Sequence, residues 1–120
     1  MPITSKQNEA GSYLNPADLV GAYAVIFLSK RTEIDAGYGQ AADRMVELAA
    51  QQPGYIGVRS VREPGGLGVT ISYWRSEADI KAWRQHLEHA ATRETGRKQW
   101  YQYYELQVCK IERAYDFGLD

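Results

Sequence analysis

Two kinds of hydrophobic pattern alternate along the chain and predict four strands and two helices. Residues 22–30 (AYAVIFLSK) place apolar side chains on both faces of a strand. Residues 38–49 instead repeat apolar side chains at the i, i+3, i+4 spacing of a one-faced helix. Alternating or aromatic-rich segments predict three more strands, at 55–63, 69–74 and 101–113.

A second helix is expected between the third and fourth strands. Ser76, three residues before Asp79, provides the N-cap signal, and Gly96 marks the expected end. Between them an apolar stripe is formed by Ile80, Trp83, Leu87, Ala90 and Ala91. We therefore expect one amphipathic helix over this whole segment.

This order of elements predicts an α+β fold of the ferredoxin-like βαββαβ class, with a four-stranded antiparallel sheet and two helices on one face. Because the strand at 22–30 is apolar on its second face too, a second subunit is the expected cover. The prediction is a homodimer that pairs through the sheet face around a barrel-like interior. Residues 1–20 are read as an N-terminal arm, either mobile or an extension at the sheet edge, and residues 21–120 as the domain.

Composition narrows the functional classes. The 120 residues include 14 basic and 15 acidic side chains without a basic cluster, so no nucleic-acid partner is expected. The longest apolar run, Ala22 to Leu28, is too short to span a membrane, and no signal peptide is recognisable. The single cysteine, Cys109, suits a reducing compartment, so a cytoplasmic location is predicted. No glycine-rich nucleotide or flavin loop opens a helix.

The two histidines are the candidate catalytic groups. His86 and His89 are three residues apart, and histidine has a suitable pKa for a general base near neutral pH. On an unbroken helix His86 flanks the apolar stripe beside Trp83, whereas His89 points nearly opposite. A break near Leu87 would turn His89 inward, so both stay candidates. The alternative is that one of them caps the helix or pairs with Glu88. Without a third ligand nearby, no metal site is predicted.

Aromatic side chains around this segment predict an apolar pocket for a small aromatic ligand. Neighbouring residues on a strand face opposite ways, so only one of Tyr73 and Trp74 can face the helices, and the other is left to the dimer interior. Packing without a ligand is the competing interpretation for all of these aromatic groups. The substrate-binding candidates are Trp83, Tyr73, Trp74, Tyr104 and Phe27.

The segment Tyr73-Trp74-x-Ser76, with Trp83, the His86-x-x-His89 pair and PGYIGVRSVRE upstream, resembles the antibiotic biosynthesis monooxygenase (ABM) family of the dimeric α+β barrel superfamily. The resemblance covers about Ala22 to Tyr115. It implies a homodimeric monooxygenase that oxidises a small aromatic or quinol-like substrate without a prosthetic group. His86 or His89 would then act as the base.

The same resemblance leaves two alternatives open. Haem-degrading relatives carry a tryptophan that Trp83 matches, but Arg93 stands where their haem-ligating histidine is expected, and residues 22–31 lack their asparagine. Haem binding would therefore need His86 or His89. The second alternative is a non-catalytic dimer that binds a small molecule, because a shared fold does not fix the chemistry.

Overall fold

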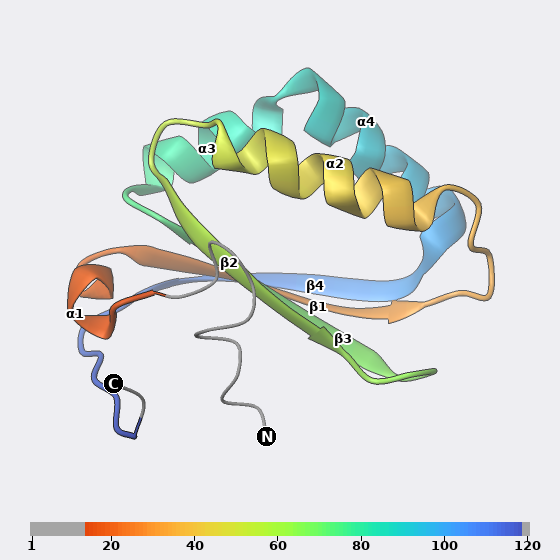
Figure 1. Ribbon diagram of the computed structural model, residues 1–120. Coiled ribbons are helices and arrows are strands. Elements are labelled where there is room, and N and C mark those ends of the chain that lie inside the picture. The colour runs from red at the N-terminus through yellow and green to blue at the C-terminus, as the bar shows by residue number, and fades with distance from the viewer. Residues whose placement is uncertain (1–13, 119–120) are drawn as a thin grey trace.

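The computed structural model describes residues 14–118, which form one four-stranded sheet with helices on one face (Figure 1). The elements in chain order are α1 (Pro16–Leu19), β1 (Tyr23–Arg31), α2 (Tyr38–Ala50), β2 (Tyr55–Arg62), β3 (Leu67–Trp74), α3 (Glu77–Gln85), α4 (Leu87–Thr95), η2 (Gly96–Trp100, a π-helical turn) and β4 (Tyr101–Lys110).

The sheet is antiparallel in the order β2-β3-β1-β4, so the two central strands are the first and third in the chain. Helices α2, α3 and α4 lie over one face, and α1 lies beyond the other (Figure 1). This arrangement confirms the predicted ferredoxin-like α+β fold. The sheet of the single chain is open, with β2 and β4 as its edges.

Strand register decides which side chains meet the helices. Trp74 has no exposed surface and packs against Trp83 of α3, so its face of β3 is the helix-facing side. The adjacent Tyr73 pairs with Ala24 and lies on the opposite side, which we call the open face. Ile26 and Ile71 form the next cross-strand pair on the open face and are both partly exposed. Both faces of β1 therefore carry apolar side chains, as the pattern predicts.

The last seven residues of the predicted N-terminal arm are folded. Asn15 caps α1 by accepting the backbone N–H of Ala17, and Pro16 occupies the first turn, where its missing N–H costs nothing. Leu14 and Leu19 are buried in a cluster with Ala24 on the open face. Leu14 and Leu19 therefore anchor residues 14–20 to the sheet, while residues 1–13 of the predicted arm lie outside the described residues.

The expectation of one continuous second helix is wrong. Helix α3 ends at Gln85, His86 adopts an extended backbone with ψ of 132°, and α4 begins at Leu87. Gly96 does mark the end of α4, but a π-helical turn continues to Trp100 before β4 starts. The last strand also ends three residues earlier than predicted, at Lys110. Within residues 14–118, no helix is long and apolar enough to cross a lipid bilayer.

Candidate active site

The break at His86 releases the backbone carbonyl of Trp83 for use outside the helix. In an unbroken helix this carbonyl would accept the N–H four residues on. Here it accepts the backbone N–H of His86 at 3.1 Å instead, and Nδ1 of His89 also lies 2.9 Å from it. One carbonyl oxygen therefore ties the end of α3 to the first turn of α4.

That contact fixes the protonation pattern of His89. A carbonyl oxygen can only accept, so Nδ1 of His89 carries the proton and donates it to the Trp83 oxygen. In the neutral ring, Nε2 then holds the free lone pair. The imidazole stacks on the Trp83 indole, with ring centroids 4.3 Å apart and planes 13° from parallel. His89 is thus held on an aromatic surface with its basic nitrogen defined.

The surroundings of His89 favour its neutral form. Burial of the ring lowers its pKa from the ordinary value of 6.5, and electrostatic interaction with Arg93, His86 and Arg84 lowers it further, against the opposing effect of the hydrogen bond to the Trp83 carbonyl. A histidine with a lowered pKa remains a proton acceptor throughout the neutral range.

His86 has the complementary role. Its Nδ1 accepts the backbone N–H of Glu88 at 3.2 Å, which makes it the N-cap of α4 and leaves Nε2 as the protonated nitrogen of the neutral ring. Its ring also contacts Trp83, with centroids 5.6 Å apart. Glu88 in turn binds Arg44 of α2 at 2.9 Å, so this turn is connected to the neighbouring helix. The capping alternative is therefore the observed role of His86.

The floor below Trp83 is provided by Trp74. Its indole stacks on Trp83 with ring centroids 6.2 Å apart, and it contacts Tyr55 edge-on with centroids 5.6 Å apart. Its Nε1–H donates a hydrogen bond to Ser72 Oγ over 2.9 Å. The buried indole therefore has its hydrogen bond satisfied within the sheet. Burial also raises the pKa of Tyr55, whose hydroxyl stays protonated at neutral pH.

A second aromatic cluster lies further along the same side of the sheet. The ring of Phe27 lies 5.3 Å from the rings of both Tyr101 and Tyr104, measured between centroids. Arg97 donates a 2.7 Å hydrogen bond to the Tyr104 hydroxyl. Burial and a hydrogen bond to Tyr38 raise the pKa of Tyr101. Phe27 and Tyr104, both predicted pocket residues, are thus brought together.

The two clusters stand at opposite ends of a stretch of helix-facing sheet that is not sealed. Phe27 lies four residues along β1 from Tyr23, which pairs with Trp74, a separation of about 13 Å of extended strand. Val25 and Ser72 form the cross-strand pair between them, and Thr70 pairs with Phe27. All three are on the helix-facing side and partly exposed, unlike the fully buried Trp74. This stretch, with His89 near one end and Phe27 at the other, is the candidate active site.

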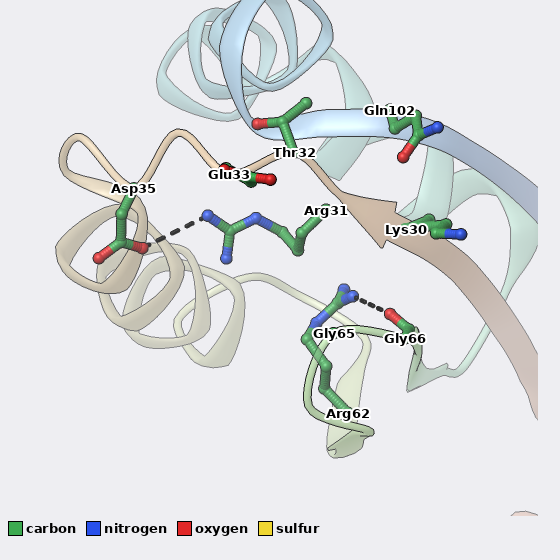
Figure 2. A pocket seen from close by; sticks show the side chains of 9 residues that line it. All are labelled: Lys30, Arg31, Thr32, Glu33, Asp35, Arg62, Gly65, Gly66 and Gln102. Carbon is green, nitrogen blue, oxygen red and sulfur yellow. Dashed lines mark hydrogen bonds and ion pairs between the residues drawn. The ribbon is translucent and has the colours of Figure 1, made fainter.

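A separate hollow of about 660 Å³ opens at the end of the sheet remote from Trp74 (Figure 2). Arg31 and Arg62 extend into it, but their guanidinium groups are engaged by the fold. Arg31 donates to the Trp100 carbonyl at 3.1 Å, and Arg62 donates to the carbonyls of Ser29 and Gly66 at 3.3 and 3.4 Å. These arginines fasten the strand ends, and no predicted site residue lines this hollow.

Tyr73 stands apart from the other predicted site residues. It lies on the open face, where a hollow of about 360 Å³ is lined by apolar side chains that include Ile26 and Ile71. Arg59 reaches its hydroxyl at 3.5 Å. The structure therefore groups Trp83, Trp74, His86 and His89 in one cluster and Phe27 with Tyr104 in another, and it separates Tyr73 from both by the thickness of the sheet.

Pattern analysis missed one charged residue in this region. Arg93 of α4 lies one turn after His89, and its Nε and Nη1 atoms are buried without a hydrogen-bond partner. Two sequence signals pointed to it: its spacing of four from His89, and its place where haem-degrading relatives carry their ligating histidine. Tyr55 and Tyr101 complete the two aromatic clusters without having been predicted as site residues.

Comparison with known proteins identifies the family. The sequence profile described as "Antibiotic biosynthesis monooxygenase" matches residues 22–95. The chain belongs to the ABM family. It is also 55% identical over 91 residues to the uncharacterized protein YqjZ of Bacillus subtilis, an alignment that covers 76% of this chain and 80% of that protein.

Solved structures confirm the ABM fold. SnoaB, a cofactor-independent oxygenase from Streptomyces nogalater, superposes with a TM-score of 0.66 at 14% identity, over 77% of this chain and 94% of SnoaB. Rv0793 from Mycobacterium tuberculosis gives a TM-score of 0.65 at 16% identity, over 82% and 96% of the two chains. At such identities the similarity establishes the shared fold.

The cap at His86 gives a first prediction. His86→Ala removes the acceptor of the Glu88 N–H and should lower the free energy of unfolding by about 1 kcal/mol. His86→Asn supplies another capping oxygen and should stay close to the wild type. Urea unfolding of the three proteins measures the difference. Equal losses in both variants would show that the ring packing, not the cap, matters.

The lowered pKa of His89 gives a second prediction, which concerns the pH dependence of folding stability. As pH falls below about 6.5, the unfolded chain takes up a proton on His89 that the folded protein resists, so folding stability decreases until the folded pKa is passed. The free energy of unfolding should therefore fall more between pH 7.5 and 5.5 in the wild type than in His89→Gln. Parallel pH dependences would contradict this assignment.

Proposed function

We propose that this ABM-family protein is a cofactor-independent monooxygenase that oxidises a small aromatic or quinol-like substrate, with His89 as the general base. The observation that carries this proposal is the geometry of His89, whose Nδ1 is fixed by the Trp83 carbonyl and whose Nε2 is left as an acceptor. SnoaB, which shares the fold, is itself a cofactor-independent oxygenase.

The site offers what such a reaction requires. A planar substrate can lie against the partly exposed surface between the two aromatic clusters, with a phenolic hydroxyl toward Nε2 of His89. His89 takes the phenolic proton, and the electron-rich anion then reduces dioxygen. His86 positions the turn that carries His89 but is not required as a base.

For an anthrone the reaction balances without a cofactor. Removal of the hydroxyl proton from the anthrol tautomer gives the anthrolate, which transfers an electron to O₂. Recombination of the radical with superoxide forms a carbon–oxygen bond, and return of the proton gives a hydroperoxide. Loss of water from the peroxide breaks the O–O bond and yields the quinone. One oxygen atom of O₂ enters the product and the other leaves as water. The protein supplies only the base and a pocket that stabilises the anion.

A homodimer through the open face completes the proposal. Ile26 and Ile71 are partly exposed on this face, Val61 is 70% exposed, and Nε of Arg59 is buried without a hydrogen-bond partner. A second copy of the sheet would cover the apolar groups and offer acceptors to Arg59.

The catalytic prediction concerns His89. With anthrone as substrate, wild-type protein should consume oxygen above the spontaneous rate and incorporate one atom of ¹⁸O₂ into the quinone. His89→Gln should lower kcat/KM by about 10²- to 10⁴-fold, because glutamine cannot accept the proton. In the wild type, kcat/KM should reach its plateau above a pKa lower than 6.5.

His86→Asn is the matched control, since it keeps a cap for α4 and removes the other imidazole. It should retain most of the activity, and the reverse order of the two variants would assign the base to His86. Haem binding can be measured with the same wild-type and variant proteins by absorption spectroscopy. A Soret shift on haemin addition that is lost in His89→Gln would favour the haem alternative, because a free Nε2 suits iron as well as a proton.

The dimer prediction uses the open face. Ile71→Glu places a charge in the centre of the proposed interface, so the variant should sediment as a monomer at micromolar concentration while the wild type sediments as a dimer. Val46→Glu, at a 48% exposed position of α2, is the control and should remain dimeric. A monomeric wild type would remove the proposed interface.

A further inference from the structure

Arg93 is a partly buried arginine, and two of its three guanidinium nitrogens are buried without a hydrogen-bond partner. Its Nε and Nη1 atoms are both inaccessible and unbonded, which leaves three N–H hydrogens without an acceptor. Buried polar groups in folded proteins almost always find a partner, so such a group calls for a physical explanation. No ion pair among residues 14–118 includes Arg93.

Nearby acidic side chains are already engaged elsewhere. Glu94, the next residue, binds Arg97 at 3.5 Å and Lys98 at 3.8 Å, and Glu88 binds Arg44 at 2.9 Å. An arginine whose role was to stabilise the fold would be expected to take one of these carboxylates. The structure instead leaves its donors unused.

The position of Arg93 relates it to the candidate base. His89 and Arg93 are four residues apart on α4, so their side chains are neighbours on one face of the helix. Arg93 is also the charged residue that most strongly opposes protonation of His89. Because α4 lies on the helix-covered side of the sheet, a partner subunit on the open face cannot supply the missing acceptor (Figure 1).

We infer that Arg93 is a ligand-binding residue that pairs with an anionic oxygen, a phenolate or a carboxylate, on an aromatic ligand bound along the helix-facing stretch between the two aromatic clusters. This deepens the proposed function, on which it rests for the location of the ligand. The ring system lies on the aromatic surface of the site. Its anionic oxygen takes the buried N–H groups of Arg93, so binding removes the cost of leaving them unpaired.

Two variants at this position separate binding from stability. Arg93→Met keeps the length of the side chain but removes the charge and all donors. At pH 7.5, calorimetric titration with 2-naphthoate should show affinity lowered at least tenfold relative to the wild type, the size expected for a hydrogen bond to a charged group. Affinity for 2-naphthalenemethanol, a neutral ligand with the same rings, should change less than threefold.

The midpoint of thermal unfolding distinguishes a ligand-binding role of Arg93 from a structural one, because the two roles predict shifts in opposite directions. With no ligand present, Arg93→Met should raise the midpoint by several degrees, because buried N–H groups without acceptors are replaced by an apolar side chain. Arg84→Met, at an exposed position of α3, makes the same chemical change and should leave both the midpoint and the naphthoate affinity near wild type.

Opposite results would overturn the inference. A wild type that does not prefer naphthoate over the alcohol, or an Arg93→Met variant that keeps its naphthoate affinity, would show that Arg93 binds no anion. A lower midpoint in Arg93→Met would assign it a structural role. None of these measurements uses oxygen consumption. Anion binding that depends on Arg93 in a protein that oxidises no anthrone would therefore retain the inference and reject the proposed function.

Discussion

The arrangement of the candidate site depends on the interruption of the helix at His86. An extended residue at this point costs the backbone hydrogen bonds that a continuous helix would make, and the structure replaces them locally. The Trp83 carbonyl accepts hydrogen bonds from the His86 backbone N–H and from Nδ1 of His89. Nδ1 of His86 caps the next helix by accepting the Glu88 N–H. Because the replacements use both imidazoles, the two histidines receive opposite tautomers and different roles.

The sheet provides the fixed side of the same site. Trp74 is fully buried and donates its indole N–H to Ser72, so it is a fixed platform for the Trp83–His89 stack above it. Further along the same face, Val25 of β1 and Thr70 of β3 stay partly exposed. The proposed function assigns the base to the well-packed end of this stretch and the ligand to its more exposed middle, a division that suits a binding site built on a folded scaffold.

Sequence patterns predicted the fold well because hydrophobic periodicity directly reports which faces are buried. The two apolar faces of β1 and the one-faced stripe of α2 each have a single reasonable interpretation. The break at His86 had no comparable signal, because no glycine or proline lies between Glu77 and Thr95 and the local propensities favour continuation. Alternation likewise required Tyr73 and Trp74 to face opposite ways, but only the register with the helices decided that Trp74 faces inward. The short α1 escaped detection because Leu14 and Leu19 sit among polar residues and are buried by tertiary contact alone.

The neighbouring charges on α4 favour a specific order of events. Arg93 discourages protonation of His89 before a ligand arrives, so the free site holds a neutral base beside a positive charge. In the proposed reaction a phenolic proton moves to His89, and Arg93 would disfavour the new imidazolium but stabilise the phenolate formed at the same moment. Arg93 would thus disfavour the protonated base and favour the anionic substrate. An unpaired guanidinium that weakens the empty protein would therefore contribute to the reaction only at the stage where negative charge develops, which is where such stabilisation accelerates a reaction.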